Sequence, residues 1–263
     1  ANADGRKIAY NSLTGDIIEN WMNGNHQHER ANREFQAAKD IMSYINDADI
    51  PNGVLPGNHD NMWGHNNDKY NEYFPTEMYS NKPWYGEAWR DGDNSAHTDF
   101  FSHEGVEFLV INLPYRPSME QMEWASQQAK DHPNHNVILA THSYLYTSGE
   151  RDSTSLRYTG NATDMWDVVV APNDNVFLVF GGHYHGVSTQ YADPKTGEQT
   201  NAVEIGRDTV AVTNVGANGR TVVEMLADYQ GYRSTQVDGD PKATRADLLD
   251  RDTGFQRLLQ FDL

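Results

Sequence analysis

Five side chains that can bind a metal ion lie in four short polar segments, and each segment follows a stretch of apolar residues. They supply one carboxylate (Asp16), one amide oxygen (Asn58) and three imidazoles (His142, His183 and His185). Because the chain contains no cysteine, a thiolate site is excluded, and this ligand set suits divalent Zn, Mn or Fe. Any one of these segments alone is most simply an ordinary turn. Four of them in succession, each at the end of a predicted strand, indicate one shared metal site.

The apolar stretches before these segments have the length and composition of short buried strands. They cover residues 8–13, 50–55, 137–141 and 176–180. Parallel strands of an α/β sheet present the loops at their carboxyl ends to the same region, which is where such sheets bind ligands. The strands are therefore expected to bring the four polar segments together.

Helices are predicted between these strands, and further strands dominate the last third of the chain. The predicted helices cover residues 29–45, 68–73, 118–130 and 164–170, the second of them inside an irregular excursion over 61–97. Ser118 is the expected N-cap of the third helix, with Gln121 in the position of a capping box. The remaining predicted strands cover residues 98–101, 106–112, 202–205, 209–213, 221–227 and 255–261. This order predicts an α/β fold whose main sheet packs against a second sheet.

The order of the motifs resembles that of the calcineurin-like metallophosphoesterases. Residues 15–20 read GDIIEN, residues 57–60 read GNHD, the lone His142 follows an apolar strand, and residues 181–186 read GGHYHG. The second and fourth of these motifs together are highly specific for that family. The resemblance implies a four-layered αββα sandwich. It also implies a metal-dependent hydrolase that cleaves phosphomonoesters or phosphodiesters of small molecules or polymers.

The resemblance assigns each candidate ligand to one of two metal ions. Asp16 matches the carboxylate that bridges the two ions. Asn58, His142 and His183 match the other ligands of the second metal, and His185 matches a ligand of the first. A pair of divalent ions holds the phosphate and makes water a stronger nucleophile at neutral pH. The ions, expected to be Zn, Mn or Fe, would also attract an anionic substrate to an acidic protein.

Two neighbouring residues are expected to serve proton transfer. His59 matches a family histidine that does not bind metal, faces the substrate phosphate and protonates the leaving oxygen. Asp60 is expected to orient His59 through a carboxylate–imidazole hydrogen bond, which would raise the pKa of the imidazole.

The chain departs from the family pattern before Asp16. Family members begin with a strand that carries Asp-x-His or Asp-x-Gln, whereas Asp4 is the only carboxylate among residues 1–13. We therefore expect the first βα unit to be missing, and residues 1–263 to form a single domain of a larger protein. The second metal keeps four ligands, but the first keeps only Asp16 and His185. An incomplete domain of this kind suggests an alternative function, a non-catalytic binding or structural module of a surface protein.

The net charge of the chain excludes some classes of binding partner. Its 263 residues include 38 Asp and Glu against 20 Lys and Arg, which gives a formal net charge of -18. Such a surface repels nucleic acids and anionic membranes, because binding to either needs clustered basic residues. No stretch approaches the roughly 20 apolar residues of a membrane-spanning helix. Abundant Tyr and Trp with few lysines favour a secreted or cell-surface bacterial protein.

Several other residues are weaker candidates for the site. His26, His28 and His65 are candidates for its rim, although solvated turns are the simpler explanation. Arg151 and Arg157 follow His142 in a polar loop, where they are candidates for contact with phosphate, although a solvated loop is the simpler explanation. An aromatic-rich insertion is a candidate wall for the substrate or packs beneath a long loop; it contains Trp63, Trp84, Tyr85 and Trp89.

Overall fold

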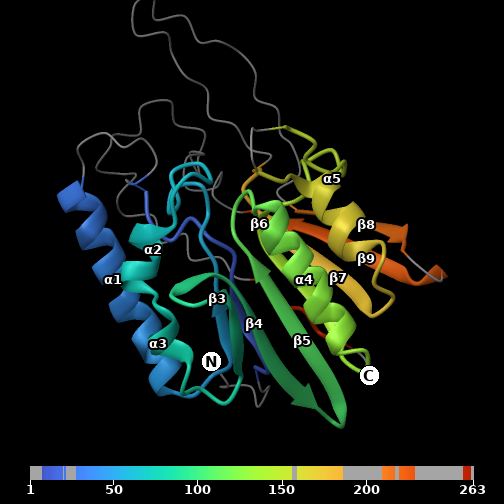
Figure 1. The fold of residues 1–263 in the computed structure, drawn as a ribbon, viewed down its shortest axis with the longest axis horizontal. Helices are drawn as coiled ribbons and strands as arrows, with labels where there is room; N and C mark the ends of the chain where they lie inside the picture. The colour runs from blue at the N-terminus through green and yellow to red at the C-terminus, as the bar shows by residue number, and fades with distance from the viewer. Residues whose placement is uncertain are drawn as a thin grey trace, which may run out of the picture.

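The computed structural model describes residues 8–19, 21, 28–155, 159–185, 209–216, 219–228 and 257–261. Its largest element is a seven-stranded mixed sheet with the strand order β3-β4-β5-β6-β7-β9-β8 (Figure 1). The strands β5, β6, β7 and β9 run parallel to one another. The antiparallel pairs are β3 with β4, β4 with β5, and β8 with β9. The strand bounds are Tyr85–Arg90 (β3), Asp93–His103 (β4), Val106–Leu113 (β5), Asn136–Ser143 (β6), Val176–Gly182 (β7), Thr209–Val215 (β8) and Thr221–Ala227 (β9).

A second sheet consists of two short parallel strands, β1 (Asn11–Leu13) and β2 (Asn52–Val54). Three helices pack near it and lie together on one side of the molecule in Figure 1; they are α1 (His28–Asp47), α2 (Asp68–Tyr73) and α3 (Thr76–Tyr79). A cluster of buried side chains that includes Phe35, Val54 and Tyr70 fills the space between these helices and the small sheet.

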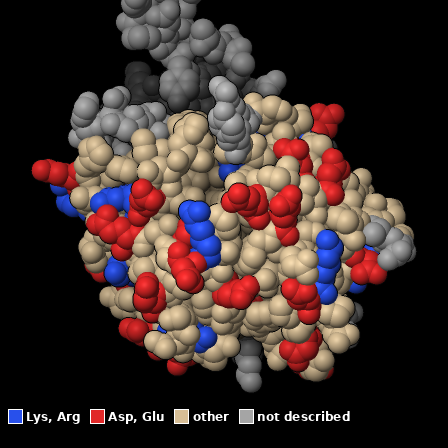
Figure 2. All heavy atoms as spheres, in the orientation of Figure 1, with Lys and Arg blue, Asp and Glu red and all other residues tan. Residues whose placement is uncertain are grey.

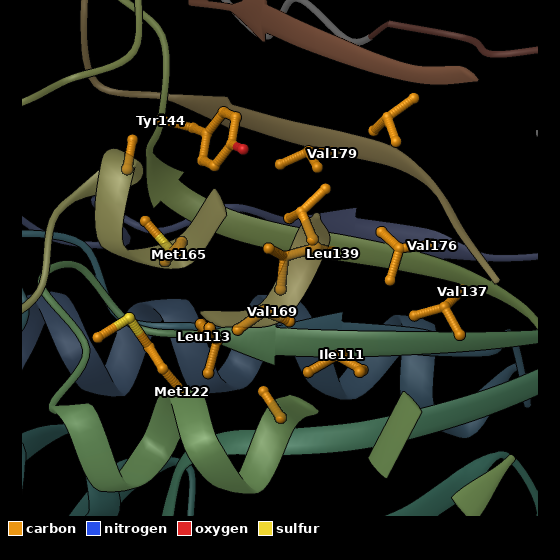
Figure 3. Packing of buried hydrophobic residues seen from close by; sticks show 14 of the residues in the cluster. Ile111, Leu113, Met122, Val137, Leu139, Tyr144, Met165, Val169, Val176 and Val179 are labelled. Atoms are coloured by element: carbon orange, nitrogen blue, oxygen red, sulfur yellow. The ribbon is translucent and has the colours of Figure 1, made fainter. Parts of the chain in front are cut away.

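The two faces of the main sheet bury different cores, because side chains alternate along a strand. Ile111 and Leu113 of β5 belong to the core beneath the second group of helices, as Figure 3 shows. Those helices are α4 (Met119–Asp131), α5 (Ala162–Met165) and the π-helical turn η1 (Trp166–Val170). Val110 of β5 lies in the core on the opposite face, together with Leu55, the residue that follows β2. The order of helices, main sheet, small sheet and helices confirms the predicted four-layered αββα sandwich.

The start of α4 matches the sequence prediction in detail. The hydroxyl of Ser118 accepts a hydrogen bond from the backbone N–H of Gln121 at 3.2 Å, and the side-chain oxygen of Gln121 accepts one from the backbone N–H of Ser118 at 2.9 Å. A cap of this kind contributes about 1 kcal/mol to stability. The predicted helix over 164–170 is also present, but it is divided into the short α5 and the π-helical turn η1.

Two parts of the predicted secondary structure are wrong. The stretch over 61–97 contains β3 and the beginning of β4, which the pattern does not reveal because buried polar residues such as Asn94 replace the expected apolar ones. Residues 257–261 do not form a strand, and Phe261 stacks on Phe108 at the face of the main sheet. The predicted strand over 202–205 lies outside the described residues.

The surface is acidic. Asp and Glu side chains outnumber Lys and Arg side chains on the face in Figure 2, in agreement with the formal net charge of -18. Among the helices of the described residues, none has both the length and the apolar composition that crossing a membrane requires.

Candidate metal centre

Loops at the ends of four strands meet at one point of the structure. Asp16 follows β1, Asn58 follows β2, His142 lies at the end of β6 and His183 follows β7. Donor atoms of Asp16, His142 and His183 all lie within 4.8 Å of one another. The amide oxygen of Asn58 lies 3.0 Å from Nε2 of His142. The structure thus brings together four of the five candidate ligands.

The side chain of His142 is at the centre of this group. Its Nε2 atom lies 3.2 Å from Nδ1 of His183 and 3.3 Å from Oδ1 of Asp16. Its Nδ1 atom lies 2.6 Å from the carbonyl oxygen of Thr14, which can only accept, so Nδ1 donates and Nε2 of the neutral ring carries a lone pair. Lone pairs of four side chains then converge on one place. A divalent cation satisfies this arrangement, so the residues fit a metal ion.

Glycine is required where the first two loops touch. A Cβ atom on Gly57 would overlap the backbone nitrogen of Asp16, and a Cβ atom on Gly15 would lie 2.5 Å from the nitrogen of Gly57. Asp16 and His183 themselves have φ angles of 52° and 70°. This left-handed conformation costs a non-glycine residue about 1–3 kcal/mol and is found preferentially at functional sites. The backbone therefore holds both ligands in strained positions that aim their side chains at the centre.

The protonation states of the ligands suit metal binding. Burial favours the neutral acid of Asp16, but His142 and His59 outweigh it and lower the pKa of Asp16 to about 2. Burial and the neighbouring His142 lower the pKa of His183 to about 3. At neutral pH Asp16 is therefore ionised and His183 is neutral, as ligands must be. Burial lowers the pKa of His142, but Asp16 and the carbonyl of Thr14 raise it above its ordinary value, so a metal ion competes with a proton there.

His59 lies beside the centre, but the expectation that Asp60 orients its ring is wrong. The imidazole Nδ1 atom of His59 donates to the carbonyl oxygen of Glu19 at 2.9 Å, and Nε2 lies 3.9 Å from Oδ2 of Asp16. Asp60 instead accepts hydrogen bonds from the backbone N–H groups of Gly57, Ile17 and Ile18, at 2.7, 3.1 and 3.0 Å. Three backbone donors therefore bind the carboxylate that was expected to orient His59. Asp60 ties the Asp16 loop to the Asn58 loop, and the carbonyl of Glu19 orients His59.

Burial changes the chemistry of Asp60 as well. Burial and the charge of Asp16 raise the pKa of Asp60 to about 6, although its backbone hydrogen bonds act in the opposite direction. A carboxyl group with a raised pKa next to a cluster of ligands is typical of a functional site.

The remaining histidine candidates are not part of the group. His185 is exposed, and the described residues that form the cluster of close donors do not include it. His65 is also exposed, and His28 packs edge-on against Trp21. His26 and Arg157 lie outside the described residues.

The structure supports neither of the two predictions for Arg151, a contact with phosphate or a position in a solvated loop, because its side chain is paired with a buried carboxylate. Its Nε and Nη2 atoms donate to the two carboxylate oxygens of Glu224 at 2.6 and 2.7 Å, and its guanidinium lies 3.7 Å from the ring centroid of Trp166. Glu224 is fully buried, and a buried carboxylate requires a partner of opposite charge. Arg151 therefore serves the core of the fold.

One aromatic wall of the site comes from a residue that the sequence reasoning missed. The ring centroid of Tyr115 lies 5.7 Å from that of His142 and 5.1 Å from that of His183. Trp63, which is 39% exposed, packs edge-on against Tyr115. Tyr115 follows β5, which is parallel to β6, and this pairing was the signal that could have identified it. The other members of the aromatic insertion, Trp84, Tyr85 and Trp89, are wholly or partly buried.

A buried carboxylate behind the site joins the loops that carry two of the ligands. Oδ2 of Asp152 accepts hydrogen bonds from the hydroxyl of Ser143 at 3.0 Å and that of Tyr184 at 3.1 Å, the residues directly after His142 and His183. The same oxygen accepts from Nη2 of Arg116 at 3.0 Å. Oδ1 accepts from the hydroxyl of Tyr146 at 2.8 Å and the backbone N–H of Thr154 at 2.9 Å. Asp152 thus fixes both loops from behind.

Replacement of Asp152 by Asn should weaken metal binding. The amide nitrogen of Asn would face donors, so part of this network would be lost and the loops would hold His142 and His183 less firmly. Residues that support ligands typically contribute about 10–100-fold to metal affinity, and we expect a loss in that range for Asp152→Asn. Calorimetric titration with Zn²⁺ measures it, with the exposed Asp167→Asn as a matched control. Equal affinities of the two variants would contradict the role assigned to Asp152.

The comparisons with known proteins agree with the geometry. The model of the calcineurin-like phosphoesterase family matches residues 12–187, a range that contains all four converging ligands. YvnB, an uncharacterized protein of Bacillus subtilis (strain 168), is 30% identical over 258 residues, which are 97% of this chain and 16% of the relative. The chain therefore spans about a sixth of the length of this curated relative. The chain belongs to the calcineurin-like phosphoesterase family.

Proposed function

We propose that the chain hydrolyses phosphomonoesters or phosphodiesters with the help of a divalent metal ion. The observation that carries this proposal is the convergence of lone-pair donors from Asp16, Asn58 and His183 around Nε2 of His142, with the imidazole of His59 beside them. Asp16, Asn58, His142 and His183 would hold the ion. A divalent ion at this place would supply Lewis-acid polarisation of a phosphate oxygen and neutralise its charge.

His59 is the proposed general acid. The carbonyl oxygen of Glu19 accepts a hydrogen bond from Nδ1–H of His59 and thereby fixes the orientation of the ring. Nε2 then faces the side of Asp16, where the protonated ring can donate to the oxygen of a departing alcohol. The ring of Tyr115, against which Trp63 packs, borders the metal centre beside His142 and His183.

The test compares hydrolysis of 4-nitrophenyl phosphate and bis(4-nitrophenyl) phosphate by metal-stripped and metal-loaded protein. We expect turnover only after loading with Mn²⁺ or Zn²⁺, and the ratio of the two rates indicates whether a monoester or a diester is preferred. Hydrolysis that is the same in the stripped protein would contradict the proposal.

A binding or structural module is the second candidate function. In the part of the chain that the structure describes, one group of close metal ligands is present, and the exposed His185 stands apart from it. We propose that a second ion, with Asp16 and His185 as its ligands, would be held more weakly than the first, because His185 is exposed and stands apart from the group of close donors among the described residues. Retention of one metal ion per chain without turnover of either ester would favour this function.

A further inference from the structure

Three consecutive backbone N–H groups, those of residues 17–19, donate to two carboxylates. The first two donate to the oxygens of Asp60 at 3.1 and 3.0 Å, and that of Glu19 donates to Oε2 of Glu34 at 3.1 Å. Hydrogen bonds to an ionised carboxylate are about twice as strong as those between neutral groups. Asp60 lies in the loop after β2 and Glu34 lies on α1, so two separate elements hold this short segment.

The last residue of this segment connects Glu34 to the proposed general acid. The N–H group of Glu19 binds Glu34, and the carbonyl oxygen of Glu19 accepts from Nδ1–H of His59 at 2.9 Å. Only the φ and ψ angles of Glu19 lie between these two backbone groups, because the peptide units on either side are planar. The direction of the carbonyl therefore depends on how firmly Glu34 holds the N–H group.

Glu34 is itself held in place. Its Oε1 atom accepts from Nε of Arg30 at 3.0 Å, one turn earlier on α1, so its two oxygens bind different donors. Ala31 and Phe35 of the same helix are fully buried in the core beneath it. Core packing thus fixes the backbone of α1, and Arg30 restricts the side chain of Glu34.

Close packing does not confine the imidazole of His59 on every side. The ring belongs, with Glu19 and Glu34, to the lining of a cavity of about 350 Å³ between this segment and α1. A side chain beside such a space has more room to turn than one in a close-packed core. The orientation of the ring therefore depends on its hydrogen bond to the carbonyl of Glu19.

We propose that Glu34 is a positioning residue for His59. Through the two backbone groups of Glu19, it keeps Nδ1 of the imidazole protonated and Nε2 directed toward Asp16, 3.9 Å from Oδ2. When Nε2 passes its proton to the oxygen of the departing alcohol, the ring keeps its other proton on Nδ1, so the bond to the carbonyl persists through the step. The effect on catalysis rests on the proposed function, whereas the effect on the ring does not.

Nitrogen NMR of the Zn²⁺-loaded protein measures the tautomer of His59 without reference to activity. In a neutral imidazole one nitrogen carries the proton and the other does not, so their chemical shifts differ. At alkaline pH we expect the proton on Nδ1 in the unmodified protein, with the signal assigned by its absence from His59→Asn. In Glu34→Ala the carbonyl of Glu19 is released, and the ring should shift to a mixture of both tautomers.

Two further variants separate the hydrogen bond from the charge and from general effects on α1. Glu34→Gln keeps an oxygen that accepts from the N–H group of Glu19, so it should retain most of the Nδ1–H tautomer. Asp40→Asn is the matched control, because Asp40 is exposed on the same helix and accepts from Gln36 at 2.8 Å. It should leave the tautomer unchanged. Circular dichroism and thermal melting establish that each variant is folded.

Turnover should follow the same order. In Glu34→Ala, kcat for an alkyl phosphate should fall by about tenfold, a part of the 10²–10⁴-fold that a general acid contributes. The rate for 4-nitrophenyl phosphate and the KM values of both esters should change little, because a nitrophenolate needs little protonation and the four metal ligands are unchanged. Glu34→Gln should restore most of the lost rate on the alkyl phosphate.

The results separate this inference from the proposed function. A proton on Nε2 in the unmodified protein, an unchanged tautomer in Glu34→Ala, or an equal shift in Asp40→Asn would each overturn the inference. An equal loss of rate on the two esters would also overturn it. The expected shift in Glu34→Ala, in a protein that hydrolyses neither ester, would support the positioning role and overturn the hydrolase. Hydrolysis of both esters with unchanged rates in Glu34→Ala would leave the hydrolase standing and overturn the inference.

Discussion

Replacement of His59 by Asn is expected to lower the turnover of an alkyl phosphate by roughly 10²–10⁴-fold, the range that a general acid contributes. The reason is that Nε2 of His59 lies 3.9 Å from Oδ2 of Asp16, beside the centre, while the carbonyl of Glu19 holds the opposite nitrogen. An alkoxide is a poor leaving group and depends on protonation. A nitrophenolate needs little help, so the loss for 4-nitrophenyl phosphate should be much smaller. Steady-state rates on both esters measure this difference.

The metal content of the His59→Asn protein is the control. His59 does not belong to the group of close donors formed by Asp16, His142 and His183, so the variant should retain the same amount of metal. Loss of metal from this variant would mean that His59 is a ligand. An equal loss of turnover on the two esters would mean that its role is not proton donation.

Replacement of His183 by Ala is expected to remove the metal ion itself. Nδ1 of His183 lies 3.2 Å from Nε2 of His142, so the variant loses one of four ligands. Residues that only support ligands typically contribute about 10–100-fold to metal affinity, and loss of a ligand should exceed that range and take turnover with it. Metal analysis of the desalted protein after loading with Zn²⁺ measures the effect.

His185→Ala is the matched control for His183→Ala. The two histidines are separated by one residue, but His185 is exposed and outside the group of close donors. The His185→Ala protein should therefore keep the tightly held ion. If it loses as much metal as His183→Ala does, the grouping of ligands described here is wrong.

The sequence predicted the parts of the site that depend on local signals. Asp16, Asn58, His142 and His183 each follow an apolar stretch, and parallel strands place such positions near one another. The capping box at the start of α4 is likewise local, since both of its partners lie within three residues. Local signals also predict a helix near residues 68–73, where the structure has α2.

The errors concern interactions between distant segments. The donors that bind Asp60 include backbone N–H groups 42 and 43 residues away in the sequence. No local sequence pattern around Asp60 predicts these hydrogen bonds. Asp152 is similar, because its partners Arg116 and Tyr184 lie 36 and 32 residues away. Arg151 resembles a solvated loop residue in the sequence, and only the fold shows that Glu224 lies beneath it. The types of these residues indicate that they are polar candidates, but their partners are distant in the sequence and are determined by the tertiary structure.

The most direct test of the metal centre is anomalous diffraction from a crystal of the protein loaded with Mn²⁺ or Zn²⁺. We expect one strong peak bounded by Asp16, Asn58, His142 and His183, whose ligand atoms lie within a few ångströms of one another. For Zn²⁺, the ion should lie about 2.0–2.2 Å from their oxygen and nitrogen atoms. Absence of a peak between these side chains, or a strong peak only at another group of residues, would contradict the account.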